Sequence, residues 1–382
     1  MNLLYLTHTC PFPPVKGDKI RCFNILKYLS KYHKINLVYP SFSAYDFLLR
    51  EHLLRYAVTV KTARVPAILP YMRSLVGLAK KIPLTVSYFY SRAIESLIDI
   101  KTIDLIMVDC SSMAAYVEKF NIPKIIDFVD IDSDKWYQYA KRSHFPRSFI
   151  YNLECNRLKK LETRLSTIFD YCIVTAEHEK KLLACRENTV VIPNGIDLEF
   201  YSPKGSVGEN ILVFTGALDY FPNIDAVLYF HDEIFPLILK EIPDVKFFIV
   251  GMNPVQKIRR LSGEHTIVTG MVDDVRDYLG RASVCTIPLR IAKGIQNKVL
   301  EAMAMQIPIV STSRANNGIM ATHEREIMIA DTPSDFARAT LLLLKNPLLR
   351  EHIAKNARLF VEKKFNWDHN LHKLNEVITI LK

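Results

Sequence analysis

The stretch VCTIPLRIAKGIQNKVLEAMAMQIPIVST, residues 284–312, decides the fold. It begins and ends with short apolar runs rich in Val and Ile, and a helical pattern lies between them. Two buried strands joined through a helix form a parallel βαβ unit, because parallel strands need a long crossover connection. The same alternation continues along the chain, which predicts an α/β fold with parallel sheets covered on both faces.

The chain is 382 residues long, which fits two domains. Apolar runs predict strands in the first half at NLLYLT, KINLVYP, IDLIMVD, PKIIDFVD and DYCIVTA. The pattern restarts after VIPNGID, residues 191–197, where Pro-Asn-Gly favours a turn. We therefore expect two Rossmann-like domains, 1–190 and 191–365, that face each other across a cleft. A last helix at 366–382 is expected to pack back on the first domain.

The basic charge is confined to the first half of the chain. Residues 1–190 carry 28 Lys and Arg against 18 Asp and Glu, a net of +10, whereas residues 191–382 carry 22 of each. The first half is therefore expected to face an anionic partner, which leaves membrane lipid, a diphosphate and nucleic acid open. The seven cysteines are scattered without a C-x-x-C pair, which is typical of thiols in a reducing cytosol.

The sequence favours a cytoplasmic location. The first residues lack the basic segment and the long apolar run of a signal peptide. No apolar run reaches the roughly 18–20 residues that are needed to span a bilayer.

The loop and helix start within 284–312 have the composition of an anion site. Arg290, Lys293 and Lys298 surround Gly294, and a helix that begins near this glycine directs its free N–H groups at the loop. Charge-assisted hydrogen bonds contribute roughly 1.5–3 kcal/mol each, so the set suits a diphosphate. Glu301 follows Lys298 by three residues, and its carboxylate suits the paired hydroxyls of a ribose. The alternative is an exposed ion pair of Lys298 with Glu301, worth about 0–1 kcal/mol.

Five segments of the second half occur in a fixed order: VIPNGIDLEFYSP, VFTGALDYFPNIDAVLYF, FFIVG, VTGMVDDV and IAKGIQNKVLEAMAMQIPIVST. Together they resemble retaining GT-B-fold glycosyltransferases of family four. The N-terminal LTHTCPFPPVKGDKIR and IIDFVDIDSDKW are similar to a subgroup found with bacterial exopolysaccharide and exosortase systems. The resemblance implies a retaining sugar transfer from a nucleotide-sugar, with no required metal or other cofactor.

The resemblance also assigns roles to individual residues. Glu301 matches the last acid of the family's E-x7-E motif, which contacts the donor ribose, and Lys293 stands where the motif has its first acid. That departure leaves the donor sugar open. Gly294 is implied to face the sugar and the phosphates, and Arg290 and Lys298 to bind the diphosphate.

Two further glycines complete the implied donor site. Gly216 lies in GALDYFPN, which lacks the usual basic pair, and Gly17 resembles the family's glycine loop over the donor phosphates. The residues that we place on the acceptor side are His8, Lys16, Lys19 and Arg21. The alternatives are a polar loop that caps a helix and a structural histidine.

Carboxylates gather in DFVDIDSDKW, residues 127–136. We expect Asp130 or Asp127 to orient or polarise the acceptor hydroxyl as the catalytic group. The alternative is an Asx-type turn with a helix cap at Ser133. Asp130 and Asp132 also form a D-x-D pair, which binds metal in glycosyltransferases of another fold, but the surrounding pattern argues against metal here.

The sequence thus predicts a glycosyltransferase that uses a UDP- or GDP-sugar. Its expected acceptor is a saccharide, in the first place a lipid-linked one, in exopolysaccharide or cell-surface glycan synthesis. Residues 61–92 mix basic and apolar side chains, and YMRSLVGLAKK within them has the pattern of a helix lying on anionic lipid. This favours a peripheral contact with the inner face of the plasma membrane, although a core helix with a solvated face stays open.

Three other functions remain open at this point. A non-hydrolysing sugar-nucleotide epimerase has a similar architecture. A catalytically inactive scaffold of a polysaccharide assembly complex fits the lysine in place of the first acid. The basic charge also fits a nucleic-acid-binding protein, but the sequence contains no recognition module, so we expect no nucleic acid as a partner.

Overall fold

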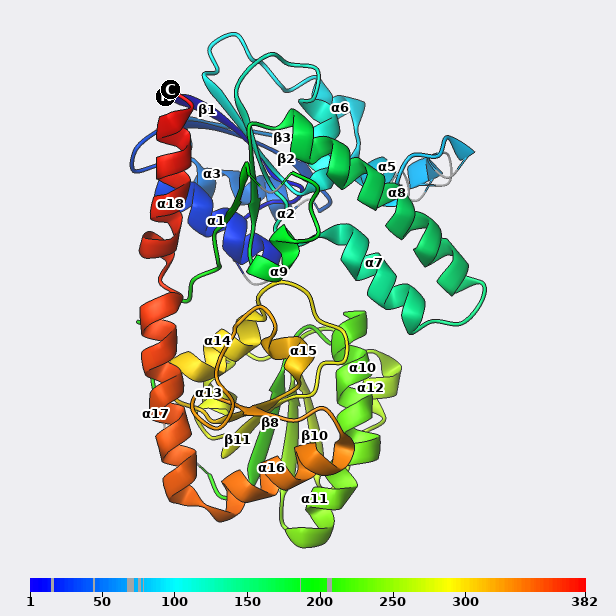
Figure 1. The fold of residues 1–382 in the computed structure, drawn as a ribbon, viewed down its shortest axis with the longest axis vertical. Helices are drawn as coiled ribbons and strands as arrows, with labels where there is room; N and C mark the ends of the chain where they lie inside the picture. The colour runs from blue at the N-terminus through cyan, green and yellow to red at the C-terminus, as the bar shows by residue number, and fades with distance from the viewer. Residues whose placement is uncertain are drawn as a thin grey trace. The chain divides into compact units, whose positions relative to one another are not determined.

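The computed structural model describes residues 1–14, 17–43, 45–66, 72–74, 77, 79–185, 187–204 and 208–382. The predicted acceptor-side Lys16 and part of the predicted lipid-binding helix at 71–81 lie outside these residues. The chain divides into two compact units, Met1–Pro193 with Asp368–Lys382, and Asn194–Trp367. Figure 1 shows the elements of each unit, which are described in turn.

The first unit is built on a parallel sheet with the strand order β3-β2-β1-β4-β5-β6-β7. The strands are β1 (Asn2–Leu6), β2 (Lys34–Ser41), β3 (Thr59–Arg64), β4 (Leu105–Asp109), β5 (Lys124–Asp127), β6 (Tyr171–Val174) and β7 (Thr189–Val191). Leu3 and Leu4 of β1 point to opposite faces, and both are almost fully buried. The sheet is therefore covered on both faces, as the apolar runs predict.

The helices of the first unit are mostly short. They are α1 (Gly17–Leu29), α2 (Tyr45–Leu48), α3 (Arg50–Leu53), α5 (Leu84–Phe89), α6 (Arg92–Glu95), the 3-10 helix η1 (Ser111–Tyr116), α7 (Asp132–Lys141), α8 (Arg147–Ile168) and α9 (Glu177–Lys180). Helix α18 (Trp367–Ile380) belongs to this unit from Asp368 onward. Figure 1 shows α7 and α8 side by side as a hairpin, with their connecting loop at the end that lies away from the sheet.

The second unit repeats the plan with the strand order β10-β9-β8-β11-β12-β13. Its strands are β8 (Ile211–Thr215), β9 (Lys246–Val250), β10 (Thr266–Gly270), β11 (Val284–Ile287), β12 (Ile309–Ser311) and β13 (Met328–Ile329). The first and last parts of the stretch 284–312 form β11 and β12, which pair in parallel from Cys285 opposite Ile309. The predicted βαβ unit and the α/β fold with two parallel sheets are therefore confirmed.

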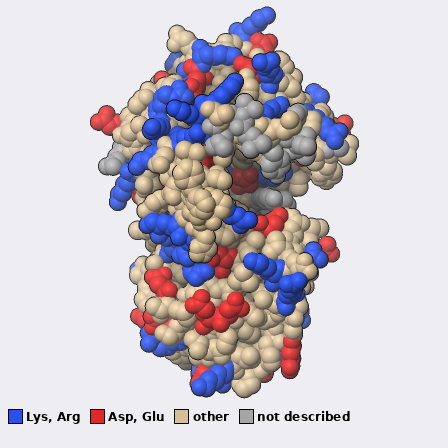
Figure 2. All heavy atoms as spheres, turned by 90° about the vertical axis from the view of Figure 1, so that its right-hand side faces the viewer, with Lys and Arg blue, Asp and Glu red and all other residues tan. Residues whose placement is uncertain are grey.

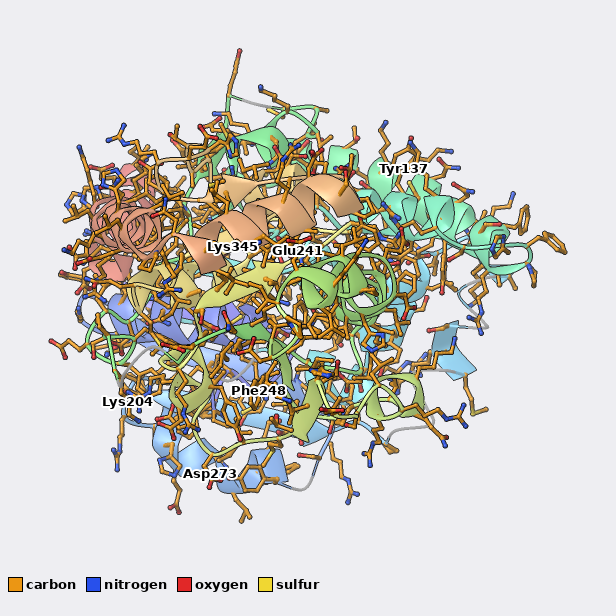
Figure 3. The ribbon with its side chains drawn as sticks, turned by 90° about the horizontal axis from the view of Figure 1, so that it is seen from below. Tyr137, Lys204, Glu241, Phe248, Asp273 and Lys345 are labelled. Atoms are coloured by element: carbon orange, nitrogen blue, oxygen red, sulfur yellow. The ribbon has the colours of Figure 1, made fainter. Side chains whose placement is uncertain are left out.

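Three consecutive helical segments of the second unit form one long, irregular helix, called the rod below. Helix α10 (Phe221–Tyr229) continues through the π-helical turn η2 (Phe230–Ile234) into α11 (Phe235–Glu241). The others are α12 (Gln256–Arg259), α13 (Arg276–Leu279), α14 (Asn297–Ala304), α15 (Ser313–Asn316), α16 (Pro333–Lys345) and α17 (Pro347–Lys364). Lys345 of α16 and Glu241 of α11, labelled in Figure 3, form an ion pair of 3.0 Å.

Helix α14 begins later than the sequence suggests. We expected it to start near Gly294, but its first residue is Asn297. Gly294 has a φ of +53°, which lies in the left-handed region, and Gln296 before the helix is extended. Residues 288–296 therefore form a loop between β11 and α14.

Basic side chains cover much of the first unit on the face that Figure 2 shows. This distribution agrees with the excess of Lys and Arg in the first half of the sequence. Within the described residues, no helix combines the length and the apolar character that crossing a membrane requires.

Candidate functional site

Each sheet reverses its strand order at one place. In the first unit the chain moves outward from β1 to β3 and then returns to the other side of β1 with β4. In the second unit the same reversal separates β8 from β11. Open parallel sheets bind ligands beyond the carboxyl ends of the two strands at such a switch point. The candidate sites are therefore the loops that follow these four strands.

Lys298 lies in the first turn of α14 at the switch point of the second unit. Its Nζ donates a hydrogen bond of 2.6 Å to Oδ1 of Asn223 and lies 4.3 Å from the ring centre of Phe214. Burial lowers the pKa of this ammonium to about 8. An amine held in this way gains from an anionic ligand, because the negative charge of the ligand offsets the loss of water around the ammonium.

Gly216 follows β8, and its backbone lies close against this ammonium. Its φ is +152°, and a Cβ at this position would lie 2.9 Å from Nζ of Lys298 and 2.7 Å from Nδ2 of Asn223. The structure thus brings Gly216 and Lys298 together, as the donor assignment requires. The sequence pattern does not indicate Asn223, because the resemblance concerns the basic pair that GALDYFPN lacks and an amide carries no charge.

Glu301 lies one turn after Lys298 and has a different partner. The hydroxyl of Tyr201 donates a hydrogen bond to its carboxylate, and burial raises the pKa of Glu301. Lys298 and Glu301 are both half-buried, and each has its own neutral partner. The alternative of an exposed ion pair is therefore wrong. Tyr201 belongs to LEFYSP in the sequence, but nothing in that pattern indicates its distant partner.

Arg290 is more constrained than the sequence suggests. Its Nε and Nη2 donate to the carboxylate of Asp225 in α10 at 3.0 and 2.6 Å, and its guanidinium stacks on Tyr229 at 4.4 Å. A guanidinium has five N–H donors, and two of them serve Asp225. The charge of Arg290 is thus already compensated by the carboxylate of Asp225. Its expected role as a direct ligand of the diphosphate is therefore weakened.

The loop before α14 is shaped by close backbone packing. The carbonyl oxygen of Gly294 passes so near to Gly318 that a Cβ there would lie 2.0 Å away. The carbonyl of Lys293 accepts a hydrogen bond of 2.7 Å from Nε2 of Gln296. The backbone at the two predicted positions is thus fixed, and the side chain of Lys293 is partly exposed.

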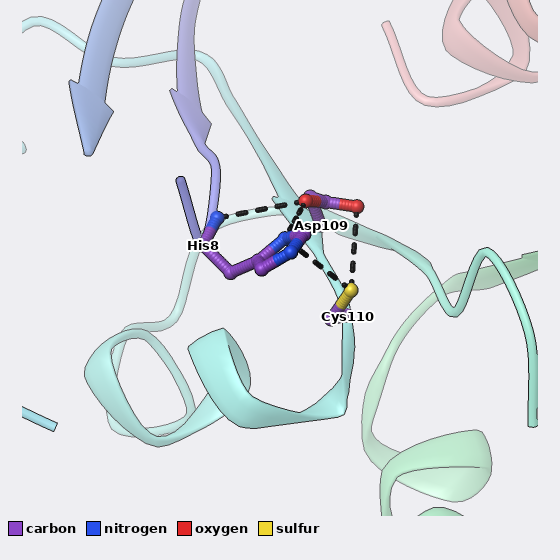
Figure 4. Close-up of side chains that lie close together, drawn as sticks. All are labelled: His8, Asp109 and Cys110. Carbon is purple, nitrogen blue, oxygen red and sulfur yellow. Dashed lines mark hydrogen bonds and ion pairs between the residues drawn. The ribbon is translucent and has the colours of Figure 1, made fainter. Parts of the chain in front are cut away.

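The switch point of the first unit contains a hydrogen-bonded histidine (Figure 4). His8 follows β1, and its Nδ1 lies 2.5 Å from Oδ2 of Asp109, the last residue of β4. Its Nε2 lies 3.1 Å from Oδ2 of Asp18 in the first turn of α1. Burial opposes protonation of His8, but Cys110 and Asp109 nearby and the hydrogen bonds to the two carboxylates raise its pKa well above its ordinary value. His8 is thus held as an imidazolium between two acids.

Cys110 completes this cluster. Its Sγ lies 3.5 Å from Nδ1 of His8 and 3.5 Å from Oδ1 of Asp109, so nitrogen, oxygen and sulfur ligand atoms come close together. The distance between Nδ1 of His8 and Oδ2 of Asp109 is that of a hydrogen bond, and burial raises the pKa of the Cys110 thiol to about 12. In the structure these three groups bond to one another and form a hydrogen-bonded network. Sequence reasoning missed Asp18 and Asp109.

The raised pKa of His8 predicts a pH-dependent stability. The pKa of His8 is higher in the folded state than its value of about 6.5 in the unfolded state. Protonated His8 therefore stabilises the fold fully at pH values below about 6.5, and this contribution is lost as the pH rises through the folded-state pKa. The difference in melting temperature between the wild type and His8→Gln is therefore expected to shrink as pH rises from about 6 to 9. His372→Gln, at an exposed imidazole, is the matched control. A difference that stays constant with pH would contradict the assigned charge.

Arg21 and Asp127 need a correction. Both are fully buried, and the guanidinium donates from Nε and Nη2 to the carboxylate at 2.7 and 3.2 Å. Nη1 of Arg21 also donates to the carbonyl of Ile192 at 3.0 Å, which ties α1 to the segment after β7. We therefore reassign this pair from acceptor binding and catalysis to structure, because no exposed surface remains for a ligand.

Asp130 lies in a sharp turn between β5 and α7. Val129 before it has a φ of +62°, and the N–H of Asp130 donates to the carbonyl of Phe128 at 2.7 Å. The alternative of a helix cap at Ser133 is wrong, since this residue lies inside α7 and its hydroxyl donates to Glu162 of α8. Asp132, the second acid of the D-x-D pair, forms an ion pair of 2.8 Å with Lys135. Asp130 is half-buried, and its catalytic role stays a prediction.

The last two predicted residues lie at the start of α1. Gly17 is its first residue and is exposed, and Lys19 in the same turn is partly exposed. Both are sequence neighbours of Asp18, which bonds to His8. Their donor and acceptor roles stay predictions.

Part of the second unit is similar to a known protein family. Residues 209–346 match the profile of the family described as "Glycosyl transferases group 1". The Bacillus subtilis protein named "Putative glycosyltransferase YtcC" is 28% identical over 222 residues, which is 50% of this chain and 54% of that protein. The "UDP-Gal:alpha-D-GlcNAc-diphosphoundecaprenol alpha-1,3-galactosyltransferase" of Escherichia coli is 26% identical over 206 residues, 49% of this chain and 53% of that protein. The matches thus span about half the length of these relatives.

A solved structure shows the same architecture along the whole chain. The crystal structure of Alr3699/HepE from Anabaena in complex with UDP has a TM-score of 0.70 at 15% identity, and the match covers 99% of this chain and 100% of that one. The two Rossmann-like units therefore have the fold of GT-B glycosyltransferases, as the sequence predicts.

Proposed function

We propose that the chain is a glycosyltransferase that takes a sugar from a nucleoside-diphosphate sugar. The observation that carries this proposal is the pairing of Lys298 with Asn223 beneath Gly216, at the switch point of a sheet inside the family-matched region. The ammonium there has a neutral hydrogen-bond partner, and only a glycine lets the backbone come so close to it. Such a group suits the developing negative charge on a departing diphosphate.

Glu301 is proposed to bind the donor ribose. Its carboxylate is oriented by the hydroxyl of Tyr201 and lies one helical turn from Lys298. One face of α14 thus offers a cation for phosphate and a carboxylate for two hydroxyls. Lys293 and the Gly294 backbone are proposed to lie near the transferred sugar, and Arg290 to shape the same pocket through Asp225.

The structural neighbours support a uridine nucleotide as the donor. HepE of Anabaena is solved with UDP, and the same protein is solved with UDP-glucose. We propose a UDP-sugar before a GDP-sugar on this ground. Transfer with retention and without a metal is proposed from the resemblance to family four, in which a donor phosphate oxygen takes the proton of the acceptor.

The first unit is proposed to bind the acceptor. Asp18 is partly exposed. Burial raises its pKa, but the hydrogen bond and the charge of His8 outweigh this effect and lower the pKa to about 2. Asp18 is therefore a carboxylate at neutral pH. A carboxylate held by His8 accepts a hydrogen bond from a sugar hydroxyl, and Asp130 is proposed to orient the reacting hydroxyl. The galactosyltransferase relative has a diphosphoundecaprenol-linked acceptor in its name, which supports a lipid-linked saccharide in cell-surface glycan synthesis at the inner face of the membrane.

A transfer assay tests the proposal. The protein is incubated with a panel of UDP- and GDP-sugars and with saccharide acceptors on a polyprenyl diphosphate, and mass spectrometry follows the glycan. We expect one donor to give an extended glycan, and no conversion without an acceptor. The anomeric configuration of the product, from NMR, tests retention. Conversion of the nucleotide-sugar without an acceptor would instead show an epimerase.

A scaffold without activity predicts a different result. No panel member would then be turned over, and Glu301→Gln would leave polymer production in cells unchanged. Under the proposed function, Glu301→Gln lowers polymer production, because the variant loses the carboxylate that holds the ribose.

A further inference from the structure

The hairpin of α7 and α8 ends in an exposed, apolar and basic tip, residues 141–150. Phe145 is 82% exposed, Phe149 63% and Ile150 40%. Single exposed apolar residues are normal on protein surfaces, but three bulky ones within six residues form a patch. The tip is the loop at the far end of the hairpin in Figure 1, and no part of either candidate site lies in it.

The charge around this patch has one sign. Between Asp134 and Glu154 the sequence contains four Lys and Arg residues and no Asp or Glu. Three of the four, Lys141, Arg142 and Arg147, are exposed residues of the tip itself. An apolar patch within a cationic rim complements a surface that is anionic outside and apolar inside.

The hairpin behind the tip is firmly packed. Trp136 and Tyr139 of α7 and Tyr151 of α8 form a cluster with ring centres 5.2 to 6.0 Å apart. Ser133 at the other end of α7 is tied to the buried Glu162 of α8. Tyr137 of α7, labelled in Figure 3, is 44% exposed, and Nζ of Lys141 lies 4.5 Å from the centre of its ring. The phenylalanines are therefore presented by a rigid support.

We propose that the tip 141–150 docks on an anionic phospholipid bilayer, with Phe145 and Phe149 in the interface and the cations on the headgroups. Aromatic side chains favour the interface between headgroups and acyl chains, and Lys and Arg there are attracted by anionic lipid. A protein partner would need an acidic surface with its own apolar pocket, whereas a bilayer supplies both features at any point. The proposal rests on the proposed function only in that a lipid-linked acceptor brings the enzyme to a membrane.

Vesicle sedimentation with the full chain tests this docking. Vesicles of phosphatidylcholine alone are compared with vesicles of phosphatidylcholine and phosphatidylglycerol. We expect the protein to pellet with the mixed vesicles and to stay in solution with the neutral ones. The double variant Phe145→Ser/Phe149→Ser is expected to bind at least about tenfold more weakly, and Arg147→Glu about fivefold or more.

Leu348→Ser is the matched control for lost apolar surface, since Leu348 is 81% exposed at the start of α17 and, among the described residues, no other exposed large apolar residue lies within five positions of it in the sequence. Arg338→Glu, at an exposed residue of α16, is the control for charge reversal. Both are expected to bind vesicles like the wild type. Equal losses in the controls, no binding by the wild type, or unchanged binding by the double variant would each overturn the proposal.

Two further readouts separate bilayer docking from self-association and from sugar transfer. Self-association in sedimentation velocity that Phe145→Ser abolishes, without vesicle binding, would replace the bilayer by a second copy of the chain. Transfer to a short water-soluble acceptor needs no bilayer. Failure of vesicle binding with normal transfer sinks only the docking, and normal docking without transfer sinks only the proposed function.

Discussion

Lys298→Met is expected to reduce strongly the stabilisation of the protein by its nucleotide-sugar. Among the residues that the structure describes, the hydrogen-bond partner of the wild-type ammonium is the neutral Asn223, so its charge is available to a phosphate. Loss of one charge-assisted hydrogen bond weakens binding by roughly 10- to 150-fold. Methionine keeps the packing of the side chain on Phe214, so the folded state survives. Thermal shift and calorimetry with the donor found in the transfer assay measure the loss.

Lys345→Met is the matched control for this substitution. Lys345 pairs with Glu241 far along the rod from the switch point, and both side chains are more than half exposed. The control is expected to bind the donor like the wild type. Unchanged donor affinity in Lys298→Met would remove the diphosphate from α14 and with it the proposed donor site.

Arg21→Met is expected to destabilise the first unit by about 3–5 kcal/mol. The substitution leaves the carboxylate of Asp127 buried without its cation, and it also removes the hydrogen bond to Ile192. Urea unfolding of the full chain, followed separately for the two units, should show an earlier transition of the first unit only. The double variant Arg21→Met/Asp127→Leu should recover part of the loss, because it removes the unpaired charge as well.

Lys31→Met is the control for this pair. Lys31 and Asp368 form an ion pair of 2.7 Å, but their side chains are 46% and 72% exposed, so the loss should be about 0–1 kcal/mol. If Arg21→Met instead unfolded at the urea concentration of the wild type while transfer was lost, Arg21 would return to the acceptor site, where the sequence alone places it.

The regular part of the fold could be predicted because its signals are local. The apolar runs of 284–312 become β11 and β12 as expected, since a strand buried on both faces needs an unbroken run of apolar residues. The start of α14 was predicted too early because a glycine between basic residues suggests a helix start in the sequence. In the structure Gly294 has a φ of +53°, which is not a right-handed helical conformation, so the helix begins after it. The observed start at Asn297 lies about one turn after the predicted one.

The site could be predicted only where its partners are close in sequence. Lys298 and Glu301 share one helix, so their spacing was visible. His8 and Asp109 are 101 residues apart, and Arg21 and Asp127 are 106 apart. Pairings of this kind arise from the crossover order of the strands, and a carboxylate buried against an arginine has the same sequence pattern as one that awaits a substrate.

The most direct test of the donor site is a crystal structure of the protein with UDP. We predict that the diphosphate lies within hydrogen-bond distance of Nζ of Lys298, above Gly216, and that the ribose hydroxyls donate to the carboxylate of Glu301. UDP bound at another place, while Lys298 stays on Asn223 and Glu301 stays on Tyr201, would contradict the account.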